Sequence, residues 1–378
     1  MIYLDNAATT QLSKPALSAL VNLSSHQYGN ASAAYGLGRK AKSCLEEARG
    51  IVARCIGAAA EEIFFTSGGT ESDNWAVSRA KDSADRIITS GIEHHAVLRP
   101  AERLKSEGME VDILPADSGC LVTPEALNAV LDGRKAFVSI MLQNNETGAV
   151  QDILSLANMV HQYNPQSIFH TDAVQAVGHR RINVHDLGVD MLSASAHKFN
   201  GPKGTGFLYI KKDCPLPALI LGGGQENGLR SGTENLAGIY AMAMALEENA
   251  ALIDQTEEHV KSLEKLLLDE LLRQGVSYQV NGGLSHKAAG IINLAIDGID
   301  GEGLLNTLDM HDICVSTRSA CNSKSKERSH VLLAMGLGGD RIDSSVRISI
   351  GRYNKAEEIL ELVKWIKRYY ELSHTARA

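Results

Sequence analysis

The sequence predicts an α/β protein, with a large domain built on a mostly parallel sheet flanked by helices and a smaller α+β domain. First, helical and strand-like patterns alternate through the first two thirds of the chain, as in parallel sheets covered by helices. Second, short strand and helix patterns mix in the last third. Third, 378 residues with 44% hydrophobic and 22% charged side chains suffice for two folded domains.

The first clear element is a helix over residues 37–56. Its apolar residues recur in steps of three and four from Ala41 to Ile56, which places them on one helix face, and Gly57 ends it. A strand at 62–67 follows, and a polar helix starts at Thr70. The alternation continues with strands at 86–90, 111–116 and 136–142 and with helices at 97–108, 123–131 and 153–163.

A long helix with interleaved charges is predicted from about Met244 to Arg273, ending before Gly275. It would bridge two domains. Beyond it the patterns indicate strands at 278–280, 291–296 and 346–350 and helices at 303–310 and 355–370. We therefore expect a large domain over residues 13–255 and a small domain formed by residues 1–12 and 256–378.

Charge and hydropathy exclude several classes of partner. The net charge of −8 disfavours non-specific binding to nucleic acid or to anionic membrane surfaces. No apolar run approaches the length of a bilayer span, and residues 1–5 lack the features of a secretory signal. We expect a cytoplasmic protein that binds neither nucleic acid nor membranes.

The six cysteines form no C-x-x-C pair, so the sequence supports neither a zinc ribbon nor a thioredoxin-like motif, and we expect no metal site. Reduced thiols are expected. Cys321 differs from the others because it lies in the polar run TRSACNSKSK, where burial is implausible and reactivity is expected.

Lys198 carries the strongest chemical signal. It lies in SASAHKFNGPKGTG, between small hydrogen-bonding residues and a glycine-rich turn, a setting that suits an amine forming a Schiff base with pyridoxal phosphate. Asp172 ends the strand-like stretch before AVQAVG, where its carboxylate could keep the pyridine nitrogen protonated. Alone, a lysine near glycines is more often a solvated loop residue and an Asp after a strand is more often a helix cap. The order and spacing of Lys198 and Asp172 favour binding of pyridoxal phosphate over these two alternatives.

A phosphate site is indicated where GGTESDN opens a helix. Gly69 permits close backbone approach, and Thr70 adds a hydroxyl at a helix N-terminus. An ordinary capped helix is the alternative. Neither G-x-G-x-x-G nor a Walker A motif occurs, which argues against dinucleotide or P-loop binding.

Three further polar residues follow or flank strands. His94 in EHHAV could stack on an aromatic cofactor or transfer protons, with zinc binding as the alternative. Asn145 in NNETGA could reach a carboxylate or a phenolic oxygen, unless it only shapes a loop. Arg347 in SSVRISIG suits an α-carboxylate, although a structural ion pair is the common alternative.

These segments occur in an order that resembles the cysteine desulfurases of the NifS/IscS type, which are class V aminotransferase-like, fold-type-I enzymes dependent on pyridoxal phosphate. The resemblance covers nearly the whole chain, starting at YLDNAATT. The matching segments are TSGGTESDN, EHHAV, NNETGA, HTDAVQAVG, SASAHKFNGPKGTG, GGGQENGLRSGTEN, RSACNS and SSVRISIG.

The resemblance implies how the cofactor is held. Lys198 would carry the Schiff base and shuttle the Cα proton, Asp172 would pair with the pyridine nitrogen, Gln175 would bond the ring hydroxyl, and His94 would stack on the ring. The phosphate would be bound by Gly69, Thr70, Ser195 and His197, with Thr233 from the other subunit of a homodimer.

The resemblance also implies the reaction. Asn145 and Arg347 would bind the carboxylate of L-cysteine, and Cys321 would attack its sulfur. L-alanine and a persulfide on Cys321 would result, and the sulfur would pass to an acceptor protein, either an iron-sulfur scaffold or a thiolation enzyme.

The sequence departs from the family pattern at two positions near functional segments. Arg318 stands where glycine is usual before Ser-Ala-Cys, and we expect it to lower the thiol pKa of Cys321. Asn227 stands where arginine is common. The chain also ends with KWIKRYYELSHTARA, short of the extension that docks the iron-sulfur scaffold in housekeeping members of the family. An acceptor other than that scaffold is therefore expected as readily as the scaffold itself.

Two enzyme alternatives and one non-enzyme alternative stay open at this point. A selenocysteine lyase would tolerate the loss of Cys321, and an aminotransferase would make no alanine or persulfide from cysteine. A non-catalytic platform with this fold would have no use for Lys198, Asp172, His94, Arg347 and Cys321 together.

Overall fold

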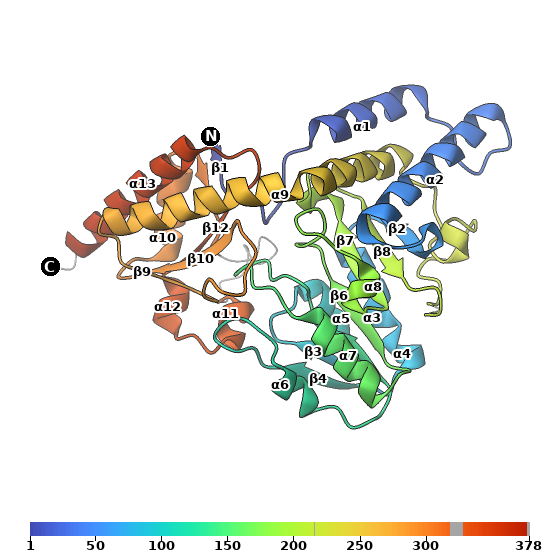
Figure 1. Ribbon diagram of the computed structural model, residues 1–378, viewed down its shortest axis with the longest axis horizontal. Coiled ribbons are helices and arrows are strands. Elements are labelled where there is room, and N and C mark those ends of the chain that lie inside the picture. The colour runs from blue at the N-terminus through green and yellow to red at the C-terminus, as the bar shows by residue number, and fades with distance from the viewer. Residues whose placement is uncertain (215, 318–327, 376–378) are drawn as a thin grey trace.

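The computed structural model describes residues 1–214, 216–317 and 328–375 and shows a large and a small lobe joined by one long helix (Figure 1). The large lobe is built on a seven-stranded sheet in the order β2-β8-β7-β6-β5-β3-β4. Its strands are β2 (Ile63–Thr66), β3 (Arg86–Ser90), β4 (Glu110–Leu114), β5 (Ala136–Ser139), β6 (Ile168–Asp172), β7 (Met191–Ser195) and β8 (Gly206–Ile210).

Strands β4, β3, β5, β6 and β7 run parallel, while β8 is antiparallel to both of its neighbours. The predicted mostly parallel sheet is therefore confirmed. Alternate residues of each strand face opposite cores: Ile168 and Met191 pack in one hydrophobic cluster, Phe169 and Leu192 in another. These central strands are buried throughout because helices cover both faces.

One face of the sheet is covered by α3 (Gly69–Ser78), α4 (Ala80–Ser83) and α5 (His95–Ser106). The other face carries α2 (Gly36–Ile56), α7 (Ile153–Tyr163), α8 (Val184–Leu187) and the first half of α9 (Leu236–Arg273), with α6 (Pro124–Asn128) beside α7 and α1 (Lys14–His26) against α9. The helices predicted over 37–56 and 153–163 agree with α2 and α7 almost to the residue.

The bridging helix α9 is longer than the sequence pattern indicated, because it begins at Leu236 and not near Met244. Asn235 caps it, accepting a hydrogen bond from the amide of Gly238. Its first turns are buried between α1, α2 and the sheet and carry almost no charges, so the interleaved-charge pattern starts only later. The first half packs in the large-lobe core and the second half in the small-lobe core.

By length and composition α9 is also the one described helix that is apolar enough to cross a membrane. The sequence analysis expected no apolar run of that length. Half of its apolar stretch is buried inside the protein, as in a core helix.

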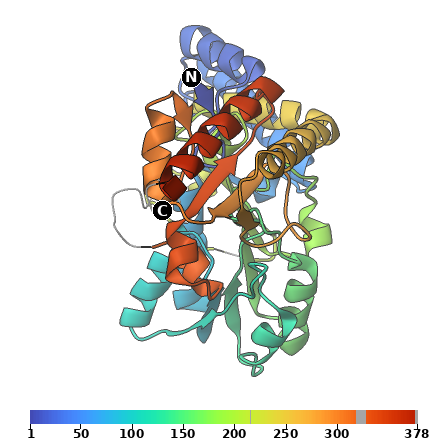
Figure 2. The same cartoon turned by 90° about the vertical axis from the view of Figure 1, so that its left-hand side faces the viewer.

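The small lobe contains a three-stranded antiparallel sheet in the order β12-β10-β9, formed by β9 (Tyr278–Val280), β10 (Ile291–Ile296) and β12 (Ser345–Ser349). A parallel pair, β1 (Ile2–Tyr3) with β11 (Ile313–Cys314), ties the N-terminus to it. The helices of this part of the chain are α10 (Gly301–Asp309), α11 (His330–Ala334), α12 (Gly339–Asp343) and α13 (Ala356–Thr375). Helices α10 and α13 pack in the small-lobe core, whereas α11 and Ile342 of α12 pack against the large-lobe core. Figure 2 shows α13 lying beside α9. The division at residues 12/13 and 255/256 stays a prediction.

Candidate active site

A cavity of about 430 Å³ opens where β5, β6 and β7 end, beside the N-terminus of α3. This is the edge at which parallel α/β sheets place ligands. The structure brings most of the predicted residues to it: Gly69, Thr70, His94, Asn145, Asp172, Gln175, Ser195, His197, Lys198 and Arg347 all line the wall. Thr233 is exposed and lies outside this lining, and Cys321 and Arg318 lie outside the described residues.

Lys198 ends a short 3-10 turn that directly follows β7. Its Nζ donates hydrogen bonds to the carbonyl oxygens of Ala7 (2.6 Å) and Ala8 (2.8 Å). Gly201 allows the chain to turn tightly behind the lysine, because a Cβ there would lie 2.8 Å from the Cβ of Ala196. The amine is therefore presented to the cavity from a fixed backbone and is held by the N-terminal segment.

Asp172 is the last residue of β6 and is 4% exposed. Its Oδ1 accepts a hydrogen bond from the amide of Val174 (2.9 Å). Burial raises the pKa of this carboxyl to about 6, while the Val174 amide and the charge of Lys198 act in the opposite direction. A protonated pyridine nitrogen of the expected cofactor, beside Asp172, would favour the ionised carboxylate further.

Two other carboxyl groups are buried near Asp172. Asp73 on α3 is 1% exposed, lines the same cavity, and has a pKa raised by burial and by the charge of Asp172. Glu93 is fully buried and accepts hydrogen bonds from the Ser90 hydroxyl (2.5 Å) and the Met141 amide (3.0 Å). Burial raises its pKa to about 8. Burial thus raises the pKa of all three neighbouring carboxyls, Asp73, Glu93 and Asp172, because close buried carboxyls do not ionise independently.

A buried histidine underlies this group of carboxyls. His170, two residues before Asp172 on β6, lies between the Ser139 and Ser193 hydroxyls at 2.8 and 2.9 Å, and its Nε2 is 3.7 Å from Asp73. Burial lowers its pKa to about 3, so the ring is neutral. Buried polar groups thus lie beneath the cavity, and the imidazole among them is neutral.

His94 is the N-cap of α5, where its Nδ1 accepts a hydrogen bond from the amide of Ala96 (3.1 Å). The proton of the neutral ring therefore sits on Nε2. Burial, with the positive charge of Lys198, lowers its pKa to about 4. A neutral, oriented imidazole at the cavity wall suits stacking on an aromatic ring.

The part of the cavity beside the N-terminus of α3 is rich in hydrogen-bond donors. Gly68 caps α3, and Thr70, Ser195 and His197 lie around the first turn of this helix. Gly206 makes this approach feasible, since a Cβ there would lie 2.5 Å from the Ala194 carbonyl oxygen and 2.7 Å from the Cα of Gly68. Free amides and hydroxyls at a helix N-terminus form a phosphate-binding arrangement.

Arg347 reaches the cavity from β12 of the small lobe, and its side chain is 2% exposed. Nη2 donates to Asp5 (2.7 Å) and Nη1 to the carbonyl oxygen of Asn145 (3.1 Å). Among the described residues its Nε has no hydrogen-bond partner. The guanidinium is thus oriented by Asp5 and by the Asn145 carbonyl oxygen at the cavity wall.

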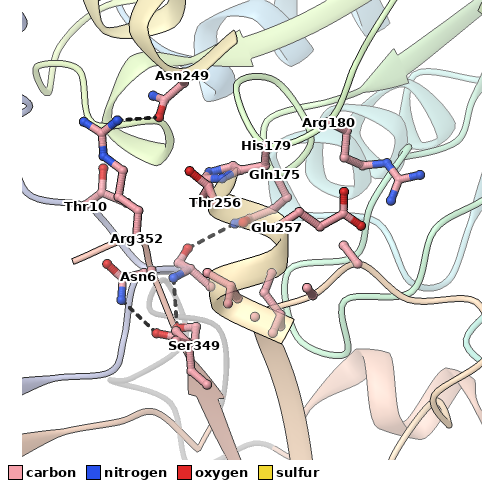
Figure 3. A pocket seen from close by; sticks show the side chains of 18 of the residues that line it. Asn6, Thr10, Gln175, His179, Arg180, Asn249, Thr256, Glu257, Ser349 and Arg352 are labelled. Carbon is pink, nitrogen blue, oxygen red and sulfur yellow. Dashed lines mark hydrogen bonds between the residues drawn. The ribbon is translucent and has the colours of Figure 1, made fainter. Parts of the chain in front are cut away.

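A second, smaller cavity of about 80 Å³ lies between the lobes behind Gln175. Figure 3 shows Arg352 turned toward Asn249 on one side and Asn6 bonded to Ser349 on the other. Gln175 separates the two cavities, because its Nε2 donates to the Ala7 carbonyl oxygen (3.0 Å) and its side chain lines both.

Several residues of the site were not found by sequence reasoning. Ala7 and Ala8 contact Lys198 through backbone oxygens, which no residue pattern reveals. Asp5 was passed over because its partner, Arg347, is 342 positions away. Asp73 was read as part of a polar helix start, although a carboxylate in the second half of that turn, facing a buried strand, was the available signal.

The geometry defines a class of protein in which a lysine, a carboxylate and a phosphate-type site face one cavity. The family model for aminotransferase class-V matches residues 2–362. A relative described as cysteine desulfurase IscS from Dictyoglomus turgidum is 40% identical over 99% of this chain and 95% of its own length. One described as putative cysteine desulfurase IscS 1 from Bacillus subtilis is 40% identical over 97% of each chain.

Solved structures agree with the sequence relatives. A NifS-like protein superposes with a TM-score of 0.91 and 36% identity over 98% of this chain and 99% of the other. The structure titled SspA in complex with cysteine gives 0.83 and 31% identity over 94% and 100%. The chain belongs to the class-V aminotransferase family and, within it, to the cysteine desulfurases of the NifS/IscS type. That family depends on pyridoxal phosphate.

Proposed function

We propose that this enzyme converts L-cysteine to L-alanine and moves the sulfur first to Cys321 and then to an acceptor protein. The observation that carries the proposal is the convergence of Lys198, Asp172 and Arg347 on one cavity, from both lobes. A desulfurase needs all three: an amine for the cofactor, a charge for the ring, and a cation for the substrate carboxylate.

The residues present fit pyridoxal phosphate. The cavity is of suitable size for a cofactor of this kind, its donor-rich end suits a phosphate, and Asp172 supplies a buried carboxyl for the pyridine nitrogen. When bound, the cofactor would withdraw electrons from the Cα of the amino acid. Gln175 would bond the ring hydroxyl, and His94 would stack on the ring.

The chain's own residues would divide the remaining work. Arg347, oriented by Asp5, and Asn145 would hold the substrate carboxylate and so direct the Cα–H bond toward Lys198. Lys198 would take the Cα proton as a base. In the overall step the Cβ–S bond of L-cysteine breaks, an S–S bond forms on Cys321, and the thiol proton is matched by the proton that Cβ gains in alanine.

Assembly and location are part of the same proposal. Thr233 is exposed in the segment 231–235 and would complete the phosphate site of a second copy in a homodimer. The acceptor would be an iron-sulfur scaffold or a thiolation enzyme, and the setting would be cytoplasmic, without nucleic acid, membrane or metal. Arg318 would lower the thiol pKa of Cys321. Asn227 would change the local charge of the segment 222–235.

The test compares wild type with Cys321→Ala on L-cysteine. Wild type should form alanine and, without added thiol, a persulfide on the peptide that contains Cys321; the variant should form neither. Alanine formation that survives in Cys321→Ala would favour a selenocysteine lyase. Absence of any reaction, with transamination of other amino acids, would favour an aminotransferase, and absence of cofactor binding would favour a non-catalytic platform.

A further inference from the structure

Ser329, eight positions after Cys321 in the sequence, is fixed to the large lobe together with the helix that it caps. Ser329 is 2% exposed, and its Oγ donates to the Oε2 of Glu146 (2.6 Å) while accepting the amide of Leu332 (3.2 Å) as the N-cap of α11. Val331 and Leu332 are fully buried in the large-lobe core. Ser329 and α11, which belong to the last third of the chain, are therefore attached to the large lobe.

The neighbouring residue makes a second attachment. His330 Nε2 donates to the carbonyl oxygen of Glu93 (2.8 Å), and its ring stacks on His95, with centroids 4.4 Å apart and an interplanar angle of 30°. Glu93 and His95 flank His94 in sequence. The attachment therefore ends on the turn that carries the imidazole of the cofactor cavity.

Glu146 itself is part of the turn that carries Asn145. The Oδ1 of Asn144 accepts the amides of Glu146 (2.8 Å) and Thr147 (3.0 Å), and its Nδ2 donates to the Ile92 carbonyl oxygen (3.0 Å), so the two turns are tied together. Glu146 is 1% exposed, and its Oε1 has no hydrogen-bond partner among the described residues. Burying a carboxyl oxygen without a hydrogen-bond partner costs free energy, so we infer that Glu146 is kept for its contact with Ser329.

We propose that Glu146, Ser329 and His330 form an anchor that fixes the chain after Cys321 to the turns that carry Asn145 and His94. They act as positioning residues, and the proposal rests on the proposed desulfurase function. Ser329 lies eight positions after Cys321 in the sequence, so the anchor attaches one end of the thiol-bearing segment beside the substrate site. This attachment matters because small misplacements of a reacting group cost large factors in rate.

The test separates reactions that need Cys321 from one that does not. β-Chloro-L-alanine loses a Cα proton and chloride and, after hydrolysis, gives pyruvate and ammonium without any thiol nucleophile. L-Cysteine needs Cys321 to accept the sulfur, and a small dithiol then removes it so that turnover continues. Both substrates use the cofactor site in the holoenzyme.

For Ser329→Ala and Glu146→Ala we expect the kcat for alanine formation from L-cysteine to fall roughly 10- to 100-fold. Pyruvate formation from β-chloro-L-alanine should change less than about 2-fold, and so should the KM for L-cysteine. Glu146→Gln keeps an acceptor oxygen for the Ser329 hydroxyl and should retain most of the rate. Thr123→Ala, which removes a comparable N-cap from α6, controls for loss of helix stability alone.

A parallel loss of both reactions in the Ser329 and Glu146 variants, or no loss in either, would overturn the anchor while leaving the proposed function standing. If wild type made pyruvate from β-chloro-L-alanine but no alanine from L-cysteine, the proposed function would fail, and the anchor with it.

Discussion

The two walls of the cavity are built in different ways. On the large-lobe wall, Asp172, Ser195 and Lys198 follow one another at the ends of the adjacent strands β6 and β7, within 27 positions of the chain. On the small-lobe wall, Arg347 depends on Asp5, 342 positions away. The groups proposed for chemistry thus sit on one rigid sheet, while the group proposed for substrate recognition sits at a seam between lobes. Damage to the first wall should lower kcat, and damage to the second should raise KM.

The largest effect is expected for Lys198→Ala. Because the proposed reaction uses this amine both to hold the cofactor and to move a proton, alanine formation from L-cysteine should fall by more than about 10³-fold. Lys212→Ala, an exposed lysine beyond β8, serves as the control and should keep the wild-type rate. Substantial alanine formation by Lys198→Ala would remove the large-lobe wall from the chemistry.

The small-lobe wall is tested by Arg347→Ala and Asp5→Asn. Loss of the guanidinium should lower kcat/KM for L-cysteine by about 10²-fold, chiefly through KM, since a charge-assisted bond to the carboxylate is lost. Asp5→Asn keeps the shape but not the charge that orients Arg347, and a change of about 10-fold is expected. Steady-state kinetics on both variants decide this. A fall in kcat with KM unchanged would contradict a recognition role.

A third comparison concerns the rigidity of the large-lobe wall. Gly206→Ala should lower the free energy of unfolding by about 2 kcal/mol, because the new Cβ would meet the Ala194 carbonyl oxygen and the Gly68 backbone. Gly36→Ala, in the first turn of α2, would meet only the flexible end of the Arg39 side chain at 3.8 Å, so it should be neutral or slightly stabilising. Urea unfolding measures both. Equal stability of the two variants would show that β8 and the α3 N-terminus can separate.

The last comparison is the pH dependence of stability contributed by Glu93. Its pKa is raised from 4.5 to about 8, chiefly by burial, so the folded protein holds a proton that the unfolded chain releases above pH 4.5. Stability from this group is complete below pH 4.5 and is lost as pH rises toward 8. Glu93→Gln, prepared free of cofactor like the wild type, should remove up to about 1.4 kcal/mol per pH unit from the slope between pH 5 and 8. Identical slopes would mean that Glu93 is ionised when folded.

The fold and the large-lobe wall could be predicted from the sequence because their signals are local. The helix predicted over residues 37–56, the strand ending at Asp172 and the turn around Lys198 each lie in one short segment with its own pattern. The start of α9 could not be predicted, since burial on all sides removes the alternation of apolar and charged residues. The Asp5–Arg347 pair and the Glu146–Ser329 contact join residues far apart in the chain, and no local pattern encodes such contacts.

Covalent mapping of the cofactor decides whether Lys198 carries it. The purified protein, loaded with pyridoxal phosphate, is reduced with borohydride, digested, and analysed by peptide mass spectrometry. We expect a single modified residue, Lys198, in the peptide that follows β7. A bound cofactor that reduction leaves unattached, or that attaches to another lysine such as Lys203, would contradict this expectation.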